Sequence, residues 1–249
     1  MITSQQLSPL NSKQLIALDF HFNEMIQLFN SKKFPNVLLL NGKKGIGKFT
    51  LTVHFLNYIY TQNEENSYNL KEKKINFKSN FYKQLINQTN QDVLFITAEE
   101  NKNIKIDEIR KLKSILSRST LSKNPRFIII DEVEFINENS VNALLKSLEE
   151  PSENNFFILI NNQQSELIKT ISSRCLKSNI FLNTREVNKV ISHLIENYNI
   201  ENLVDFSKDL TPGLFIRFNE IFLQLDITKN DEIQAQINKL FNAYKKKKR

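Results

Sequence analysis

The 249-residue chain contains only four glycines, and three of them lie within six residues, in the stretch LLLNGKKGIGKFT (Leu38–Thr50). At the average usage of about 7%, a chain of this length would hold roughly 17 glycines. Glycine adopts left-handed backbone angles without a steric cost. A chain that otherwise avoids glycine therefore needs unusual backbone geometry between Gly42 and Gly47.

The stretch matches the phosphate-binding pattern G-x-x-x-x-G-K, with Gly42, Gly45, Gly47 and Lys48 at its key positions. An apolar run before it predicts a buried strand, and apolar residues at helical spacing after it predict a helix. In that context the loop N–H groups and the helix N-terminus bind phosphates, and the lysine reaches the β- and γ-phosphates. The pattern therefore predicts a nucleotide site, and the other interpretation is a glycine-rich turn without a ligand.

The position after the lysine departs from this pattern. A Ser or Thr hydroxyl at that position holds Mg²⁺, whereas this chain has Phe49. Thr50 lies about 100° further around the helix and is not expected to reach the same metal. We therefore predict that the loop keeps its geometry but does not support Mg·ATP hydrolysis, with no metal ligand assigned and Thr50 as a candidate nucleotide contact.

Two acids follow a second buried strand, in the sequence RFIIIDE (Arg126–Glu132). Four consecutive apolar residues predict a strand buried on both faces, as in parallel sheets. Ligands bind at the carboxyl edge of such sheets, where Asp131 would hold Mg²⁺ through water and Glu132 would activate the attacking water. Asn162 follows the next predicted strand (156–160), either as a sensor of the γ-phosphate or as part of an ordinary turn.

Strands and helices alternate from the loop to about residue 175, which predicts an α/β fold with a parallel sheet and right-handed crossovers. The pattern from Thr184 onward is helical throughout. We therefore expect an α/β domain over residues 1–180 and a small helical domain over residues 181–249.

Three local expectations complete this outline. Apolar residues at helical spacing predict an N-terminal helix from Gln14 to Phe29. Residues 61–91 are polar and rich in Asn and Lys, so we expect an insert or an irregular helical region. Either Asn137 or Asn139 can cap the helix that follows the acidic strand.

The net charge is +7 and the sequence pI is about 9.3, which suits a nucleic-acid partner. Five of the positive charges lie in the tail KKKKR (Lys245–Arg249), which is either part of that surface or a solvated end. A predicted helix carries a basic face made by Arg110, Lys111, Lys113 and Arg118. Such a face is either solvated or in contact with the DNA backbone.

The cysteine count and hydropathy exclude other classes. A single cysteine, Cys175, excludes an internal disulfide and a zinc site built from several cysteines. No apolar run approaches the roughly 20 residues of a membrane span, so no membrane partner is expected. The N-terminus MITSQQLSPL has neither the basic nor the apolar region of a secretory signal. We therefore expect a cytoplasmic protein.

Six motifs occur in a specific order, namely LLLNGKKGIGK, IKIDEIRKL, FIIIDEVEFIN, NSVNALLKSLEEP, FFILINN and TISSRC. Together they resemble the bacterial clamp-loader branch of the AAA+ family, and within it the delta-prime subunits of DNA polymerase III. The similarity runs from about Leu18 to Cys175 and more loosely to about Phe222; NALLKSLEEP and SRC are its most specific parts. The resemblance implies a RecA-like AAA+ domain, a helical lid domain and a helical collar, which is short or absent here because only about 25 residues follow Phe222.

The resemblance also assigns roles to individual residues. It implies that Lys48 is the P-loop lysine, that Asp131 and Glu132 are the acidic pair, and that Asn162 is the sensor. Arg174, in the sequence Ser-Arg-Cys, resembles the arginine finger that acts in trans on ATP bound by the neighbouring subunit. A planar, permanently charged guanidinium is suited to stabilising charge on a γ-phosphoryl group. The other interpretation of Arg174 is an ordinary surface arginine.

Three departures from the family pattern bear on the nucleotide site. Phe49 replaces the metal-binding hydroxyl, and Leu214 follows the Pro-Gly step where the lid usually offers a sensor arginine, although Arg217 lies one turn on. The region after Tyr60 lacks the four zinc cysteines of the ATP-hydrolysing relatives. These departures imply that no zinc is bound and that the nucleotide site is weakened or empty, which leaves ATP binding open.

We therefore expect a clamp-loader subunit of the DNA polymerase III holoenzyme that helps load the sliding clamp onto primed DNA during replication. Its own ATPase would be weak or absent, and its partners would be the gamma or tau subunits, the delta subunit, the clamp and DNA. The alternative is an ATP-hydrolysing motor-type subunit, which Lys48, Asp131 and Glu132 favour. A stand-alone nucleotide kinase would need an arginine-rich lid, which the second domain does not offer.

Overall fold

The computed structural model describes residues 7–98, 103–116, 124–198, 200, 202–203 and 210–247. Within them, five parallel strands form a sheet in the order β2-β3-β4-β1-β5. The strands are β1 (Val37–Asn41), β2 (Val93–Ile96), β3 (Arg126–Asp131), β4 (Asn155–Asn161) and β5 (Leu176–Asn179). This arrangement confirms the predicted α/β fold with a parallel sheet.

The helices of the described residues alternate with the strands and then follow them. They are η1 (Pro9–Asn11), α1 (Asp19–Asn30), α2 (Lys48–Tyr60), α3 (Asn80–Ile86), α4 (Ile106–Leu116), η2 (Val133–Phe135), α5 (Glu138–Glu149), α6 (Lys169–Ser172), α7 (Thr184–Tyr198), α8 (Pro212–Gln224) and α9 (Ile233–Lys247). Asn137 is the residue that caps α5, because its side chain accepts a hydrogen bond from the Ser140 N–H.

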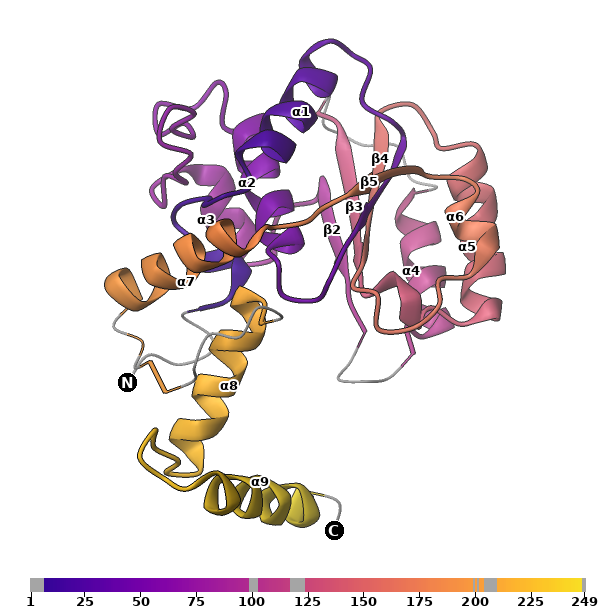
Figure 1. The fold of residues 1–249 in the computed structure, drawn as a ribbon. Coiled ribbons are helices and arrows are strands. Elements are labelled where there is room, and N and C mark those ends of the chain that lie inside the picture. Colours follow the sequence, from indigo (N-terminus) through magenta and orange to yellow (C-terminus); the bar gives the residue numbers. More distant parts are fainter. Residues whose placement is uncertain are drawn as a thin grey trace.

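The sheet is buried on both faces, which explains the uninterrupted apolar runs of its central strands. In β1, Leu38 and Leu40 belong to the apolar cluster beneath α1, α2 and α3, whereas Val37 and Leu39 belong to the cluster beneath α4, α5 and α6. This division follows the two-residue period of a strand. Figure 1 shows the two groups of helices on opposite faces of the sheet.

The segment after α2 is attached to the N-terminal segment around a buried histidine. His54 Nδ1 lies 2.9 Å from the Tyr68 hydroxyl, and Nε2 lies 3.1 Å from the Ser12 carbonyl oxygen. Since a carbonyl can only accept, Nε2 carries the proton and Nδ1 accepts from Tyr68. Burial lowers the pKa of His54 to about 3, so the ring is neutral in the folded protein.

The predicted N-terminal helix was too long. It begins at Asp19 rather than Gln14, because Leu15 donates its N–H to the Lys73 carbonyl at 3.0 Å and Ala17 has a left-handed φ of 63°. Strand β5 and helix α3 were not predicted as separate elements. The polar segment 61–91, which we expected to be an insert or an irregular helical region, contains α3 as its regular helix.

Helices α7, α8 and α9 follow the sheet, and α9 lies farthest from it (Figure 1). The division of the chain at residue 180 stays a prediction. The expected helical segment from Leu203 to Phe206 lies mostly outside the described residues, as does Arg118 of the predicted basic face. Arg110, Lys111 and Lys113 are exposed on α4 as expected.

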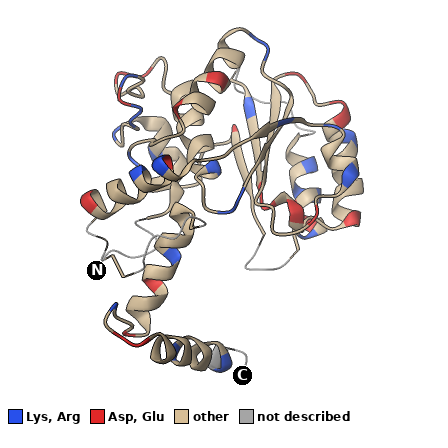
Figure 2. Ribbon diagram, viewed as in Figure 1, with Lys and Arg blue, Asp and Glu red and all other residues tan. Residues whose placement is uncertain are grey.

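Charged residues of both signs are interspersed over the α/β part of the chain in Figure 2. Of the helices that the structure describes, none is long and apolar enough to cross a membrane. The described residues also contain no group of three or more His, Cys, Asp or Glu side chains placed to hold a metal ion.

The neutral, buried state of His54 predicts a specific pH dependence of stability. A histidine in the unfolded chain has a pKa of about 6.5, whereas His54 in the folded chain titrates near 3. As the pH falls below 6.5 the unfolded chain takes up a proton that the folded chain does not. The stability from this group is therefore complete above pH 6.5 and is lost as the pH falls toward 3.

Between pH 7 and pH 5 we expect the wild type to lose about 2 kcal/mol more unfolding free energy than His54→Gln. Urea unfolding followed by circular dichroism at the two pH values measures this difference. His193→Gln, on α7, is the control and should change the pH dependence far less. Equal pH dependence in the wild type and His54→Gln would contradict the assignment.

Candidate nucleotide site

The phosphate loop connects β1 to α2 at the carboxyl edge of the sheet. Gly47 is the N-cap of α2 and has φ 97°, a left-handed conformation that strains any other residue. At Gly42 a Cβ would lie 2.3 Å from the Ile180 carbonyl oxygen. These two constraints account for glycine at both ends of the loop, in the strand–loop–helix context that the sequence predicts.

Lys48 begins α2 and is only 2% exposed. Its ammonium donates to the carbonyl oxygens of Gly42 at 2.7 Å and Lys43 at 2.8 Å. Burial lowers the pKa of Lys48 to about 8, an effect that Asp131 and Glu134 oppose. The lysine is thus held inside the loop, where a phosphate bound by the loop would contact it.

An aromatic residue takes the place in the sequence of the metal-binding hydroxyl. Phe49 stacks on Phe95 of β2, with ring centroids 5.5 Å apart and an interplanar angle of 30°. Its ring has no lone pair for Mg²⁺, and the neighbouring Thr50 lines the adjoining cavity. The residues at this position therefore do not fit the metal that a P-loop normally binds beside the phosphates.

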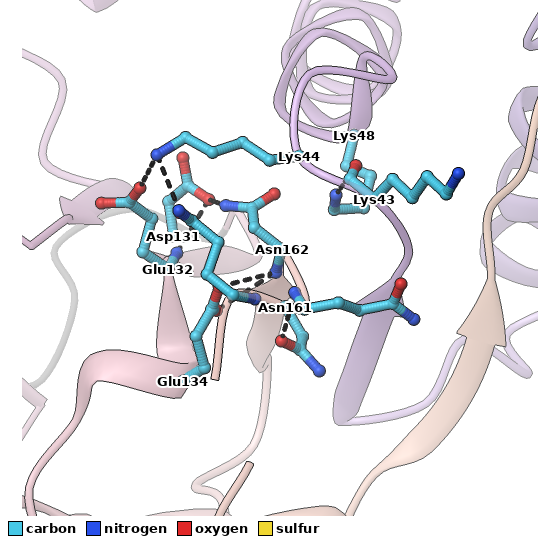
Figure 3. A network of polar contacts seen from close by, with 10 residues as sticks. Lys43, Lys44, Lys48, Asp131, Glu132, Glu134, Asn161 and Asn162 are labelled. Atoms are coloured by element: carbon cyan, nitrogen blue, oxygen red, sulfur yellow. Dashed lines mark hydrogen bonds and ion pairs between the residues drawn. The ribbon is translucent and has the colours of Figure 1, made fainter. Parts of the chain in front are cut away.

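The two acids lie at the end of β3, facing the loop (Figure 3). Asp131 Oδ1 accepts from the Glu132 N–H at 2.8 Å and from Asn162 Nδ2 at 3.1 Å. Burial raises the pKa of the Asp131 carboxyl, and the charge of Glu132 raises it further. The order of the strands places β4 between β3 and β1, so Asn162 lies between the acids and the loop.

Lys44 of the loop was not among the predicted site residues, and it forms the closest contact to the acidic pair. Its ammonium lies 2.6 Å from Glu132 Oε1 and 2.9 Å from Gln164 Oε1 (Figure 3). The carboxylate expected to activate water is thereby paired with a lysine of the same chain. Nothing in the pattern G-x-x-x-x-G-K specifies this residue, so the motif could not have predicted the pair.

Further polar contacts, also absent from the sequence-based prediction, fix the edge of the sheet. The buried Glu134 carboxylate accepts from the Asn162 N–H at 3.1 Å to each oxygen. Asn161 donates to Asn41, and Asn41 donates to Asn179, each at 2.9 Å. This row of amides joins the ends of β4, β1 and β5, and so fixes the strand ends from which the site residues project.

The segment that contains α7 and α8, which we call the lid, contacts the loop directly. The Gly213 N–H donates to the Gly45 carbonyl oxygen at 2.8 Å, and the Thr211 hydroxyl donates to the Lys44 carbonyl oxygen at 2.8 Å. Both contacts use carbonyl oxygens of the loop, whereas a phosphate is bound by its N–H groups. Docking of the lid and binding of a phosphate therefore do not compete for the same backbone atoms.

A cavity of about 370 Å³ lies between the loop, the N-terminal segment and the lid. The predicted residues Gly45, Gly47, Lys48, Thr50, Asp131, Glu132 and Asn162 all line it. Gly42 lies outside it and lines a neighbouring cavity. Leu214 and Arg217 of α8 also line the cavity, so the lid offers an arginine one turn beyond the expected position.

Arg174 lies just beyond α6 and does not line this cavity. Its Nε and Nη2 contact Glu149 Oε1 at 2.7 and 2.5 Å, and its Nη1 donates to the Thr170 carbonyl at 2.9 Å. Helices α5 and α6 cover the face of the sheet opposite to α2 (Figure 1). The structure thus brings together the other predicted site residues and leaves Arg174 apart from them.

The sequence of this chain matches a known protein family. Residues 19–183 match the family described as "DNA polymerase III, delta subunit". The match covers most of the chain, including the phosphate loop, the acidic strand and Arg174. The chain belongs to this family.

Two curated relatives are named DNA polymerase III subunit delta'. The protein of Buchnera aphidicola subsp. Schizaphis graminum is 31% identical over 156 residues, which are 62% of this chain and 45% of the relative. The protein of Pseudomonas aeruginosa is 32% identical over 152 residues, which are 61% of this chain and 44% of the relative. The chain thus spans about half the length of the curated relatives it matches.

The fold also has a solved counterpart. The Thermotoga maritima RuvB Holliday junction branch migration motor is similar with a TM-score of 0.50 and 16% identity, covering 94% of this chain and 72% of that chain. At this identity the likeness concerns the fold alone. It agrees with the expected fold, an α/β domain followed by helices.

The contact between Gly213 and Gly45 predicts a stability cost for a single methyl group. A Cβ at residue 213 would lie 2.6 Å from the Gly45 Cα, so the lid or the loop must move. We expect Gly213→Ala to lose about 1–3 kcal/mol of unfolding free energy. Hydrogen exchange of the loop amides should also become faster in this variant.

Gln224→Ala, at the exposed end of α8, is the matched control and should leave both measurements unchanged. Thr211→Ser keeps the hydroxyl that bonds the loop, whereas Thr211→Val removes it. We expect only the valine variant to destabilise the protein. Wild-type stability and exchange in Gly213→Ala would show that the loop and the lid are not held together in this way.

Proposed function

We propose that this chain acts as a delta-prime-type subunit of the DNA polymerase III clamp loader. Family membership and the curated relatives named delta' support the assignment. In this role the chain assembles with the gamma or tau subunits and the delta subunit, and the complex loads the sliding clamp onto primed DNA. Such a role is exercised in the cytoplasm, where the chromosome is replicated.

Within that complex, Arg174 would supply positive charge to ATP bound by the neighbouring subunit. Its separation from the cavity of its own chain supports action in trans. Its side chain is 31% exposed and that of its partner Glu149 is 47% exposed. An ion pair exposed to this extent contributes only about 0–1 kcal/mol, so releasing the guanidinium toward a triphosphate costs little.

The chain's own site would contribute little or no hydrolysis. A hydrolytic site needs a metal beside the phosphates and a carboxylate free to activate water. Here Phe49 replaces the metal-binding hydroxyl, and the Lys44 ammonium is hydrogen-bonded to Glu132. The motor-type alternative remains the competing function, because Lys48, Asp131 and Asn162 converge on one cavity.

The proposal predicts that the purified chain does not turn over ATP above background. If the chain does not hydrolyse ATP, removing a lysine that only binds phosphate has no rate to lower. Lys48→Ala should therefore give the same background level of phosphate release. Steady-state phosphate release with Mg·ATP measures it. Robust turnover that Lys48→Ala abolishes would establish the motor-type function instead.

A second prediction concerns the assembled complex. With its gamma or tau and delta partners present, the chain should stimulate ATP hydrolysis at the adjoining site, and Arg174→Ala should remove that stimulation. An arginine finger contributes about 10³-fold or more to the rate at the site it serves. Arg174→Lys should rescue little, because lysine cannot present the planar guanidinium.

Arg185→Ala is the control, since Arg185 is an exposed arginine on α7. Size-exclusion chromatography should give the same assembly for all variants, which separates loss of stimulation from loss of binding. Full stimulation by Arg174→Ala in an intact complex would exclude the arginine-finger role.

A further inference from the structure

The cavity beside the phosphate loop presents cations from three elements. Lys44 comes from the loop, Lys48 from the start of α2 and Arg217 from α8, and all three line the cavity. A bound polyphosphate would place several negative charges close to these three side chains. Asp131 and Glu132 also line this cavity, so its Lys and Arg side chains exceed its carboxylates by one charge, a balance that favours an anionic ligand.

The residues that would bind a metal beside the phosphates are either substituted or engaged in other contacts. Phe49 takes the sequence position of the metal-binding hydroxyl, and its ring stacks on Phe95. The carboxylates at the end of β3 are already engaged, since Glu132 is paired with Lys44 and Asp131 Oδ1 accepts two hydrogen bonds. A metal ion would have to displace these contacts and would find no hydroxyl ligand on α2.

Lys44 offers a substitute for the metal's charge. An ammonium has three N–H donors. Two of them are used by Glu132 and Gln164, which are the partners that the described residues provide. The third can bond a phosphate oxygen, while the pairing with Glu132 reduces the repulsion that this carboxylate would exert on an uncomplexed phosphate.

We propose that this site binds a nucleoside diphosphate or triphosphate without a divalent cation, with Lys44 and Lys48 supplying the charge that a metal normally provides. The nucleotide would be a fixed structural ligand of the subunit, because the same contacts that admit it exclude the hydrolytic arrangement.

The remainder of the cavity suits the nucleoside part. Away from the loop it is lined by apolar side chains of the N-terminal segment and of the lid helices, namely Leu15, Ile16, Val190, Leu194 and Ile216. Its volume of about 370 Å³ is within the range of small-molecule sites. A base placed there would contact the lid and the α/β domain together.

This inference concerns the same loop as the proposed function but does not rest on assembly with partners. It is tested on the full chain alone, by titration with fluorescent N-methylanthraniloyl-ADP and -ATP in buffers containing either Mg²⁺ or EDTA. We expect dissociation constants that agree within about twofold in the two buffers. Binding that requires Mg²⁺ would overturn the proposal, and so would the absence of binding in both buffers.

The role of Lys44 is tested by Lys44→Ala, which should weaken binding in EDTA by about tenfold, the value of one charged hydrogen bond. Lys83→Ala is the matched control, because it removes the same charge from an exposed lysine on α3 that does not line the cavity. Its affinity should equal that of the wild type. Thermal unfolding confirms that both variants are folded, and unchanged affinity in Lys44→Ala would overturn the assignment.

Competition with tripolyphosphate tests the ligand class. We expect it to displace the fluorescent nucleotide at least about tenfold less effectively than unlabelled ATP, because it lacks the base and ribose. Equal displacement would overturn a nucleotide as the ligand. None of these outcomes depends on Arg174, so failure here and failure of the stimulation experiment are distinguishable.

Discussion

The position of the phosphate loop is the constraint on which the site depends. The loop is held from the sheet side by the Lys44–Glu132 ion pair, and from the lid side by the hydrogen bond between Gly213 and Gly45. Two glycine backbones meet at the second contact, and a side chain on either would collide with the other. The fourth glycine of this glycine-poor chain is therefore required by its contact with Gly45 of the loop.

These two attachments hold the loop in place, although the side chains around it differ from those of a hydrolytic site. The parallel sheet still brings the ends of β1, β3 and β4 together, and the row of amides from Asn161 to Asn179 fixes that edge. The chemical groups placed there have different partners from those of a hydrolytic site. Lys44 pairs with Glu132, the expected base, and Phe49 replaces the residue whose hydroxyl would bind the metal. In the proposed function, the α/β fold supports the loop, and these side-chain contacts would favour binding of a nucleotide over its hydrolysis.

Much of this could be predicted from the sequence. The glycine spacing predicted the loop, and the apolar runs predicted β1 and β3, because strands buried on both faces leave a strong pattern. The sequence also placed Lys48, Asp131 and Asn162 at one edge. Strand β5 was missed because Leu176–Asn179 is a polar, largely exposed edge strand without a hydrophobic pattern.

The contacts that define the chemistry of the site could not be predicted from local sequence patterns. Lys44 and Glu132 are 88 residues apart, and Thr211 bonds a loop residue 167 positions away. No periodicity records such pairs, because they depend on how the strands are ordered and where the lid docks. The early start predicted for α1 failed for a related reason, since a long-range hydrogen bond from Leu15 to Lys73 competes with the helix.

The central claim is that the chain contributes charge to a neighbour's nucleotide instead of hydrolysing its own. The most direct measurement is a structure of the assembled complex with a non-hydrolysable ATP analogue. The account predicts that Arg174 leaves Glu149 and that its guanidinium lies about 3 Å from a γ-phosphate oxygen on the adjoining subunit. A guanidinium still paired with Glu149, or directed into solvent away from any triphosphate, would contradict it.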